Sequence, residues 1–208
     1  MKFTLFLFYS ICQCFIKKSK TVNIVIMNRK IALTTLFFLS VFALSAQEAR
    51  YGIKSAIIKK TSEVMGGKVE QIQYIDDYGA KEAHVSDTAL KIIKENTDID
   101  IMLKSKTGTK RVIPKDRLNF MKLTPEMIRK NELKKEGEEE VAGKMCDKYA
   151  MTIDVMGRKA PSTVWIWKGV VMKRVVPSVG LTELVTEIQE NVAVKAEVFL
   201  VPDDVTIQ

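Results

Sequence analysis

The feature that most constrains the fold is the stretch over residues 162–176, which is apolar on both faces of an expected β-hairpin. Its central Lys-Gly dipeptide is typical of a two-residue turn, in which glycine supplies a positive φ. Because opposite residues share a face, this turn would place Trp167 opposite Val170 and Trp165 opposite Met172. The other face would carry three further apolar side chains: Val164, Ile166 and Val171.

A hairpin that is apolar on both sides restricts the architecture. A sheet with one wet face alternates apolar and polar side chains along each strand. The hairpin is therefore covered by protein on both faces, or one face lines an apolar cavity, or one face forms an oligomer interface. The sequence leaves these three alternatives open and does not give the oligomeric state.

Strands are expected over most of residues 47–208, because short apolar or alternating stretches are separated by glycine- and aspartate-containing turns. The stretch 89–93 fits either a strand or a helix, and the charged run 134–140 is expected to be a solvated loop. The expected strands cover residues 51–59, 68–75, 81–85, 99–104, 111–118, 144–155, 162–167, 170–176, 184–189 and 195–201.

One helix is indicated in the middle of the chain. Thr124 can cap its N-terminus, Pro125 fits the first helical position, and the helix is expected to end near Leu133. Met127 and Ile128 would then form an apolar patch facing the tryptophan hairpin. Strands at both ends with one or two helices between them predict an α+β fold, in which a curved antiparallel sheet is covered by helices on one face.

The beginning of the chain has the features of a targeting segment. Residues 1–46 carry six basic and no acidic residues. Within them, residues 27–46 show a basic start, an apolar core and small residues at the end, which is the layout of a secretory signal peptide. Met27 begins this signal and is interpreted as the true start. Two transmembrane helices are the alternative, although each apolar run is shorter than the roughly 20 residues that a span needs.

Cleavage is expected after Ala46, which leaves a single domain of residues 47–208, or alternatively after Ser45. Gln47 rather than a lipid-accepting cysteine follows the expected site. We therefore expect a soluble periplasmic protein of a Gram-negative cell envelope.

Removal of the leader changes the charge of the protein. The whole chain has 33 basic and 25 acidic residues, so without the six basic residues of the leader 27 remain against 25. A nucleic-acid-binding domain carries a basic face or stripe. The nearly balanced domain argues against a nucleic-acid partner.

The sequence contains no recognisable catalytic, cofactor or metal motif. His84 is the single histidine and is expected on the surface of a strand. Cys146 is the one cysteine beyond the leader and is expected to be a small buried apolar residue. We therefore expect no catalytic residues, no metal ligands and no cofactor. Two pairs of carboxylates are expected to serve turns: Asp76-Asp77 and Asp203-Asp204.

Four segments occur in an order that resembles the LolA/LolB-like superfamily of lipoprotein-localisation factors, over about residues 50–208. They are Gly-Lys-Met-Cys-Asp-Lys-Tyr-Ala-Met (143–151), Val-Trp-Ile-Trp (164–167), Val-Val-Met-Lys (170–173) and Val-Phe-Leu-Val-Pro (198–202). The resemblance implies an unclosed antiparallel β-barrel with helices over an apolar cavity, where carriers of the family hold acyl chains.

These observations lead to an expected function. The chain is interpreted as a non-enzymatic periplasmic binding or carrier module for an apolar ligand such as a lipid or an acylated lipoprotein. A structural or protein-interaction domain of the cell envelope is the alternative. The residues expected to line the apolar site are Trp165, Trp167, Val170, Met172, Met127 and Ile128.

Overall fold

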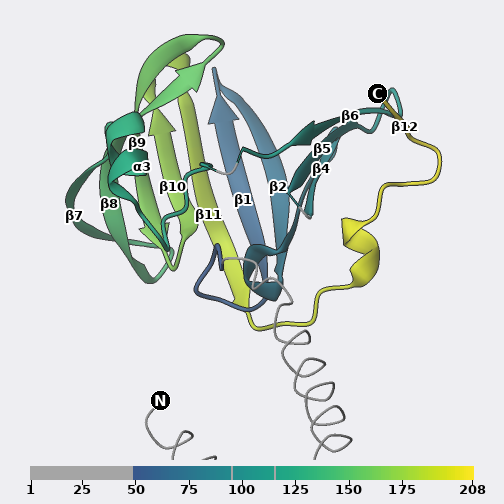
Figure 1. The fold of residues 1–208 in the computed structure, drawn as a ribbon, viewed down its shortest axis with the longest axis horizontal. Coiled ribbons are helices and arrows are strands. Elements are labelled where there is room, and N and C mark those ends of the chain that lie inside the picture. The colour runs from purple at the N-terminus through teal and green to yellow at the C-terminus, as the bar shows by residue number, and fades with distance from the viewer. Residues whose placement is uncertain (1–48, 95, 115) are drawn as a thin grey trace, which may run out of the picture. The chain divides into compact units, whose positions relative to one another are not determined.

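The computed structural model describes residues 49–94, 96–114 and 116–208, and the expected leader lies outside these residues. The described residues form a twelve-stranded sheet that curves without closing into a barrel, with one α-helix and three short 3-10 helices (Figure 1). The predicted α+β fold is confirmed. One parallel strand pair, β12 with β6, joins the otherwise antiparallel sheet.

The elements follow the chain in this order: β1 (Ala56–Val64), β2 (Gly67–Asp76), η1 (Asp77–Gly79), β3 (Lys81–Ser86), β4 (Ala89–Lys94), β5 (Thr97–Met102), β6 (Thr107–Val112), α3 (Pro125–Lys130), β7 (Lys134–Val141), β8 (Lys144–Val155), β9 (Arg158–Trp167), β10 (Val170–Val176), η2 (Pro177–Val179), β11 (Leu181–Glu190), η3 (Ala196–Phe199) and β12 (Thr206–Ile207).

The sheet consists of two runs of hairpins joined edge to edge. Its strand order is β12-β6-β5-β4-β3-β2-β1-β11-β10-β9-β8-β7. Consecutive strands pair within β1–β6 and within β7–β11. The two runs meet where β1 pairs with β11, from Ala56 opposite Glu190 to Val64 opposite Leu181. This long-range pairing places the first strand, β1, beside β11 near the middle of the sheet, whereas the last strand, β12, lies at one edge.

The tryptophan hairpin forms as predicted at its turn and differs further along. Lys168 and Gly169 both have positive φ, and Trp167 lies opposite Val170. Trp165 lies opposite Lys173, not Met172, because β10 contains an irregularity between Val171 and Lys173 that adds one residue to the strand. The predicted Trp165–Met172 pairing is therefore wrong.

Most of the buried apolar side chains among the described residues belong to one of two clusters. The first cluster joins the tryptophan face of the hairpin to β1, β2 and β11: Tyr51, Ile53, Ala56, Ile58, Ile75, Val141, Cys146, Trp165, Val170, Met172 and Val185, with Trp167, Val175 and Ile188 packed against them. The second cluster contains the other face of the hairpin: Leu133, Met151, Val164 and Ile166, with Leu118, Phe120, Leu123, Tyr149, Ile153 and Val171 around them. Both faces of the hairpin are therefore covered.

The segments on either side of α3 provide the apolar cover over β8 and β9, because Leu118, Phe120, Leu123 and Leu133 belong to the second cluster and no residue of α3 does. Thr124 caps the helix through its side chain, as predicted, but the helix ends at Lys130 and has no buried residue. Met127 is half-buried, Ile128 is exposed, and neither belongs to a cluster. The expected apolar patch facing the tryptophans is not formed by these two residues.

Two further predictions of local structure are wrong. Residues 134–140 belong to β7, a strand at the sheet edge whose side chains are exposed except for Val141. Charged side chains are common on edge strands because they oppose pairing with other chains, so this strand has no apolar alternation. Residues 195–201 contain η3 instead of a strand, with Phe199 buried as its anchor.

Candidate functional site

The segment that precedes β1 is fixed between two turns. The amide of Arg50 donates to the carbonyl of Tyr78 at 2.9 Å, in the turn between β2 and β3. The amide of Gly52 donates to the carbonyl of Lys168 at 2.9 Å, in the turn between β9 and β10. These backbone bonds place Arg50 and the aromatic ring of Tyr51 over the sheet.

Glycine is required at both of these turns. Gly79 has a φ of +89°, and a Cβ there would lie 2.6 Å from the ring of Tyr51. Gly169 has a φ of +81°, and a Cβ there would lie 2.6 Å from the carbonyl oxygen of Arg50. A larger residue would therefore displace the segment that carries Arg50 and Tyr51.

A buried carboxylate lies at the centre of the polar side chains held by this arrangement. Glu82 on β3 is 1 % exposed. Its Oε2 accepts a 2.8 Å hydrogen bond from the Tyr51 hydroxyl, and its Oε1 lies 3.1 Å from Nε of Arg50. Gln73 on β2 donates to Tyr51 Oη at 3.3 Å, and His84 Nε2 lies 3.6 Å from Glu82 Oε2. Residues from three separate parts of the chain thus meet at one carboxylate.

The environment keeps this carboxylate ionised. Burial by itself would raise the pKa of Glu82, but the interaction with His84 and the positive charges of Arg50 and Arg117 outweigh burial and lower the pKa to about 2. Burial, with the charge of Glu82 as the next cause, raises the pKa of Tyr51 well above its usual value. Tyr51 therefore stays a neutral hydrogen-bond donor.

A second buried ion pair lies beside the first. Glu183 on β11 accepts from Nζ of Lys60 at 3.1 Å and lies 3.8 Å from Nη1 of Arg174. Burial alone would raise the pKa of Glu183, but the charges of Lys60 and Arg174 lower it below its usual value. Lys60 is only 5 % exposed, so removal of Glu183 would leave a buried positive charge without its partner.

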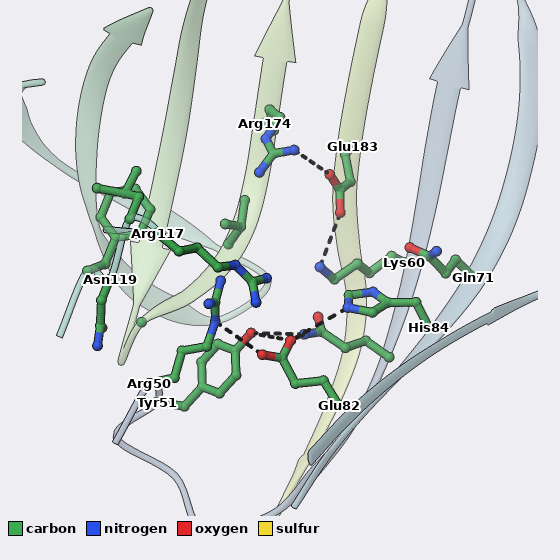
Figure 2. A pocket seen from close by; sticks show the side chains of 15 residues that line it. Arg50, Tyr51, Lys60, Gln71, Glu82, His84, Arg117, Asn119, Arg174 and Glu183 are labelled. Carbon is green, nitrogen blue, oxygen red and sulfur yellow. Dashed lines mark hydrogen bonds and ion pairs between the residues drawn. The ribbon is translucent and has the colours of Figure 1, made fainter. Parts of the chain in front are cut away.

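These groups surround a pocket of about 420 Å³ (Figure 2). Four of its side chains are basic and two are acidic, which leaves an excess of positive charge. Among the residues that the structure describes, its lining contains no serine, threonine or cysteine. The fifteen lining residues are Arg50, Tyr51, Lys60, Gln71, Gln73, Glu82, His84, Arg117, Leu118, Asn119, Phe120, Gly169, Val171, Arg174 and Glu183.

One wall of the pocket is apolar. Leu118, Phe120 and Val171 line the pocket and also pack against the second cluster. Phe120 further contacts Tyr149 on β8, with ring centroids 5.8 Å apart. The pocket therefore joins a cationic region over β1–β3 and β11 to an apolar wall between β10 and the chain before α3.

The tryptophans that the sequence analysis selected lie outside this pocket. Trp165 is 5 % exposed and belongs to the first cluster together with Val170 and Met172, and Trp167 packs against them. Lysine ammonium groups lie over both indoles, for example Lys173 at 4.3 Å from the ring of Trp165. The structure thus gathers four of the six predicted lining residues in one packed cluster and leaves Met127 and Ile128 apart. A ligand role for these six residues stays a prediction.

His84 and Cys146 can now be placed. The prediction that His84 lies on the surface is wrong, because its side chain is 18 % exposed and lines the pocket beside Glu82. Cys146 is buried as predicted. In the part of the chain that the structure describes, no three His, Cys, Asp or Glu side chains form a group that could hold a metal ion. Nor is any described helix long and apolar enough to cross a membrane.

Sequence reasoning missed the pocket because its residues come from several segments that lie far apart in the chain. A partial signal was present on β2 and β3, where polar residues recur at alternate positions: Gln71 and Gln73, then Glu82 and His84. The register pairs Gln73 with His84 directly. Such a repeat indicates a polar patch on one face of a hairpin, but it does not show that the patch is buried.

Comparison with known proteins gives the fold. No family model matches the sequence, and no curated protein does. An uncharacterised conserved protein from Thermus thermophilus is similar in structure, with 10% identity, a TM-score of 0.53, and 76% of this chain and 91% of that one covered. MucB in the MucA/MucB complex of Pseudomonas aeruginosa has 14% identity and a TM-score of 0.53, with 77% of this chain covered.

A second MucB structure has 13% identity and a TM-score of 0.50, with 83% of this chain covered. The chain spans 60% and 64% of the length of the two MucB chains, so it is similar to a part of them. These similarities, all below 25% identity, show the fold alone. The unclosed curved sheet that the resemblance to LolA/LolB-like proteins implied is confirmed.

Proposed function

We propose that this chain is a non-enzymatic binding or carrier module of the cell envelope that takes the apolar part of a lipid or an acylated protein against the wall formed by Leu118, Phe120 and Val171. The observation that carries the proposal is the pocket itself. A volume of about 420 Å³ lies within the usual range for small-ligand sites, and a rigid curved sheet forms its floor.

Two further observations support a binding role over catalysis. His84 and Glu82 are adjacent, but the described residues that line the pocket include no hydroxyl or thiol nucleophile other than the Tyr51 phenol, whose pKa is raised. The structures similar in fold include MucB in complex with MucA, a protein that binds another protein. Export of this chain, inferred from the leader, would place the module in the periplasm.

The proposal is tested with an uncharged amphiphile. Thermal unfolding of the protein purified after export is followed with and without decyl maltoside below its micelle concentration. A ligand at a hundredfold excess over its dissociation constant stabilises the folded state by about 2.7 kcal/mol. Leu118→Ser should abolish this stabilisation, whereas Leu200→Ser, at an exposed leucine outside the pocket, should retain it. No stabilisation of the unmodified protein by any uncharged or charged amphiphile would contradict the proposal.

A protein-interaction function is the second candidate, and β7 favours it. This strand ends the sheet, so one side of its backbone has no strand partner among the described residues. Open edges can accept a further strand from another protein. Its glutamates oppose indiscriminate pairing. Loss of a captured envelope protein on Glu140→Lys, at an exposed position of β7, with unchanged amphiphile binding, would identify this second function.

A further inference from the structure

Arg117 differs from the other basic residues of the pocket because it has no carboxylate partner among the described residues. Arg50 pairs with Glu82, and both Lys60 and Arg174 lie beside Glu183. Arg117 lines the same pocket without such a pair. Four basic and two acidic side chains line the pocket, so Arg117 contributes to a local positive excess, although the charge of Glu82 partly favours its charged form.

Without a bound anion, the surroundings of Arg117 disfavour its positive charge. Burial, and next the neighbouring charge of Arg50, lower the pKa of Arg117 below its usual value. Figure 2 shows the two guanidinium groups close to one another above Glu82. A guanidinium remains charged at neutral pH even so. An anion placed between Arg117 and Arg50 would relieve this repulsion.

A second donor in the pocket also lacks an acceptor. Nε of Arg174 is buried and has no hydrogen-bond partner in the part of the chain that the structure describes. A buried donor left without an acceptor costs free energy that a bound acceptor can recover. Gln73, which is 3 % exposed, has a buried Oε1 with no donor, and it can accept from a hydroxyl on the same ligand.

We propose that Arg117, with Arg50 and Arg174, binds a compact oxyanion, either a carboxylate or a phosphate, as the head group of the ligand whose apolar part lies against Phe120. Guanidinium groups bind these anions through paired, charge-assisted hydrogen bonds. The apolar part of this ligand rests on the proposed function. Its anionic head group rests on the charges of the pocket. The inference names the ligand class as an anionic amphiphile.

The test compares four probes by isothermal titration calorimetry on the protein purified after export: decanoate, decyl phosphate, decyl maltoside and inorganic phosphate. The anionic amphiphiles should bind at least about tenfold more tightly than the uncharged one, since hydrogen bonds to charged groups are the stronger class. Their affinity should fall when sodium chloride is raised from about 50 to about 500 mM, because added salt screens the attraction.

Arg117→Gln is the informative variant, with Arg129→Gln as its control at an exposed arginine on α3. Arg117→Gln should remove the preference for anionic probes, and Arg129→Gln should retain it. Because Arg117 is desolvated and repelled by Arg50, the unliganded Arg117→Gln protein should be at least as stable to urea as the unmodified protein. A clear loss of stability would make Arg117 a structural counter-ion of Glu82 and overturn the inference.

The probes separate this inference from the proposed function. Equal binding of charged and uncharged amphiphiles would overturn the anion site and leave the proposed function standing. Arginine-dependent binding of inorganic phosphate as tight as that of decyl phosphate would support the anion site and contradict the role of the apolar wall. Absence of binding by all four probes would contradict both.

Discussion

Replacement of Glu82 by glutamine tests whether the buried carboxylate holds the pocket together. Glutamine has the same shape and still accepts the hydrogen bond that Tyr51 donates to Glu82 at 2.8 Å. The change therefore removes the charge that faces Arg50 and His84, with little change in volume. Since the glutamate is almost completely buried, solvent does not screen the interaction appreciably.

The expected magnitude follows from the pKa of Glu82. A fall from the ordinary value of 4.5 to about 2 corresponds to about 3 kcal/mol of stability, at about 1.4 kcal/mol per pH unit. The folded-state pKa is depressed, so this stability is fully present above about pH 4.5. It is lost as the pH falls from about 4.5 to about 2.

Urea unfolding of the unmodified protein and of Glu82→Gln, repeated from about pH 7 down to about pH 2, measures this effect. The variant should be less stable by about 3 kcal/mol at pH 7, and the two curves should converge as the carboxylate is protonated. Glu187→Gln is the matched control, because Glu187 forms a solvent-exposed ion pair with Lys59, and it should show a far smaller difference. The reasoning would be refuted if the stability difference between the unmodified protein and Glu82→Gln were small at pH 7, or if it did not decrease at acidic pH.

Three further predictions concern the turn, the first cluster and the leader. In urea unfolding, Gly169→Ala should lower the stability by about 1–3 kcal/mol more than Gly157→Ala does. Both glycines have a positive φ, but a Cβ at Gly157 meets nothing within 4 Å, whereas one at Gly169 would clash with Arg50. Equal losses of stability in the two variants would contradict this clash. Trp165→Ala should lower the stability by about 3–5 kcal/mol in the same assay. Amphiphile binding should leave the tryptophan emission unchanged, since neither indole lines the pocket. A ligand-induced shift of the emission would instead indicate the tryptophan face as the binding site. N-terminal sequencing of the exported protein should give Gln47, or Ala46 for the alternative cleavage, and a start upstream of Ile31 would disprove the signal peptide.

The curved sheet was largely predictable because strand patterns are local. Alternation and turn residues predicted β2, β3, β8 and β10 closely, and the Lys168-Gly169 turn set Trp167 opposite Val170. The cap at Thr124 was predictable for the same reason, since its bond to the Met127 amide is made three residues away. Such features depend on backbone geometry within a few residues.

Errors arose where tertiary pairing overrides local pattern. The charged residues of β7 form a strand because β8 offers backbone partners, which a sequence of exposed side chains does not reveal. The register of Trp165 changed because β10 contains an extra residue, and a single insertion alters every pairing beyond it. The end of the chain lost its predicted strand at 195–201, where η3 anchors through Phe199.

The sequence by itself determined the sheet-rich class, a hairpin with two apolar faces and the cap of the helix, because these depend on the order of apolar, polar and turn residues along a short stretch. That both faces of the hairpin are covered was decided by the tertiary structure. The tertiary structure alone decided the pocket. Glu82 becomes a strongly ionised buried group only when Arg50 and Tyr51, which lie far earlier in the chain, are held over it. The lowered pKa values of Glu82 and Arg117 both arise from burial combined with charges that are close in space but distant in the chain, and neither value is encoded in a local sequence pattern.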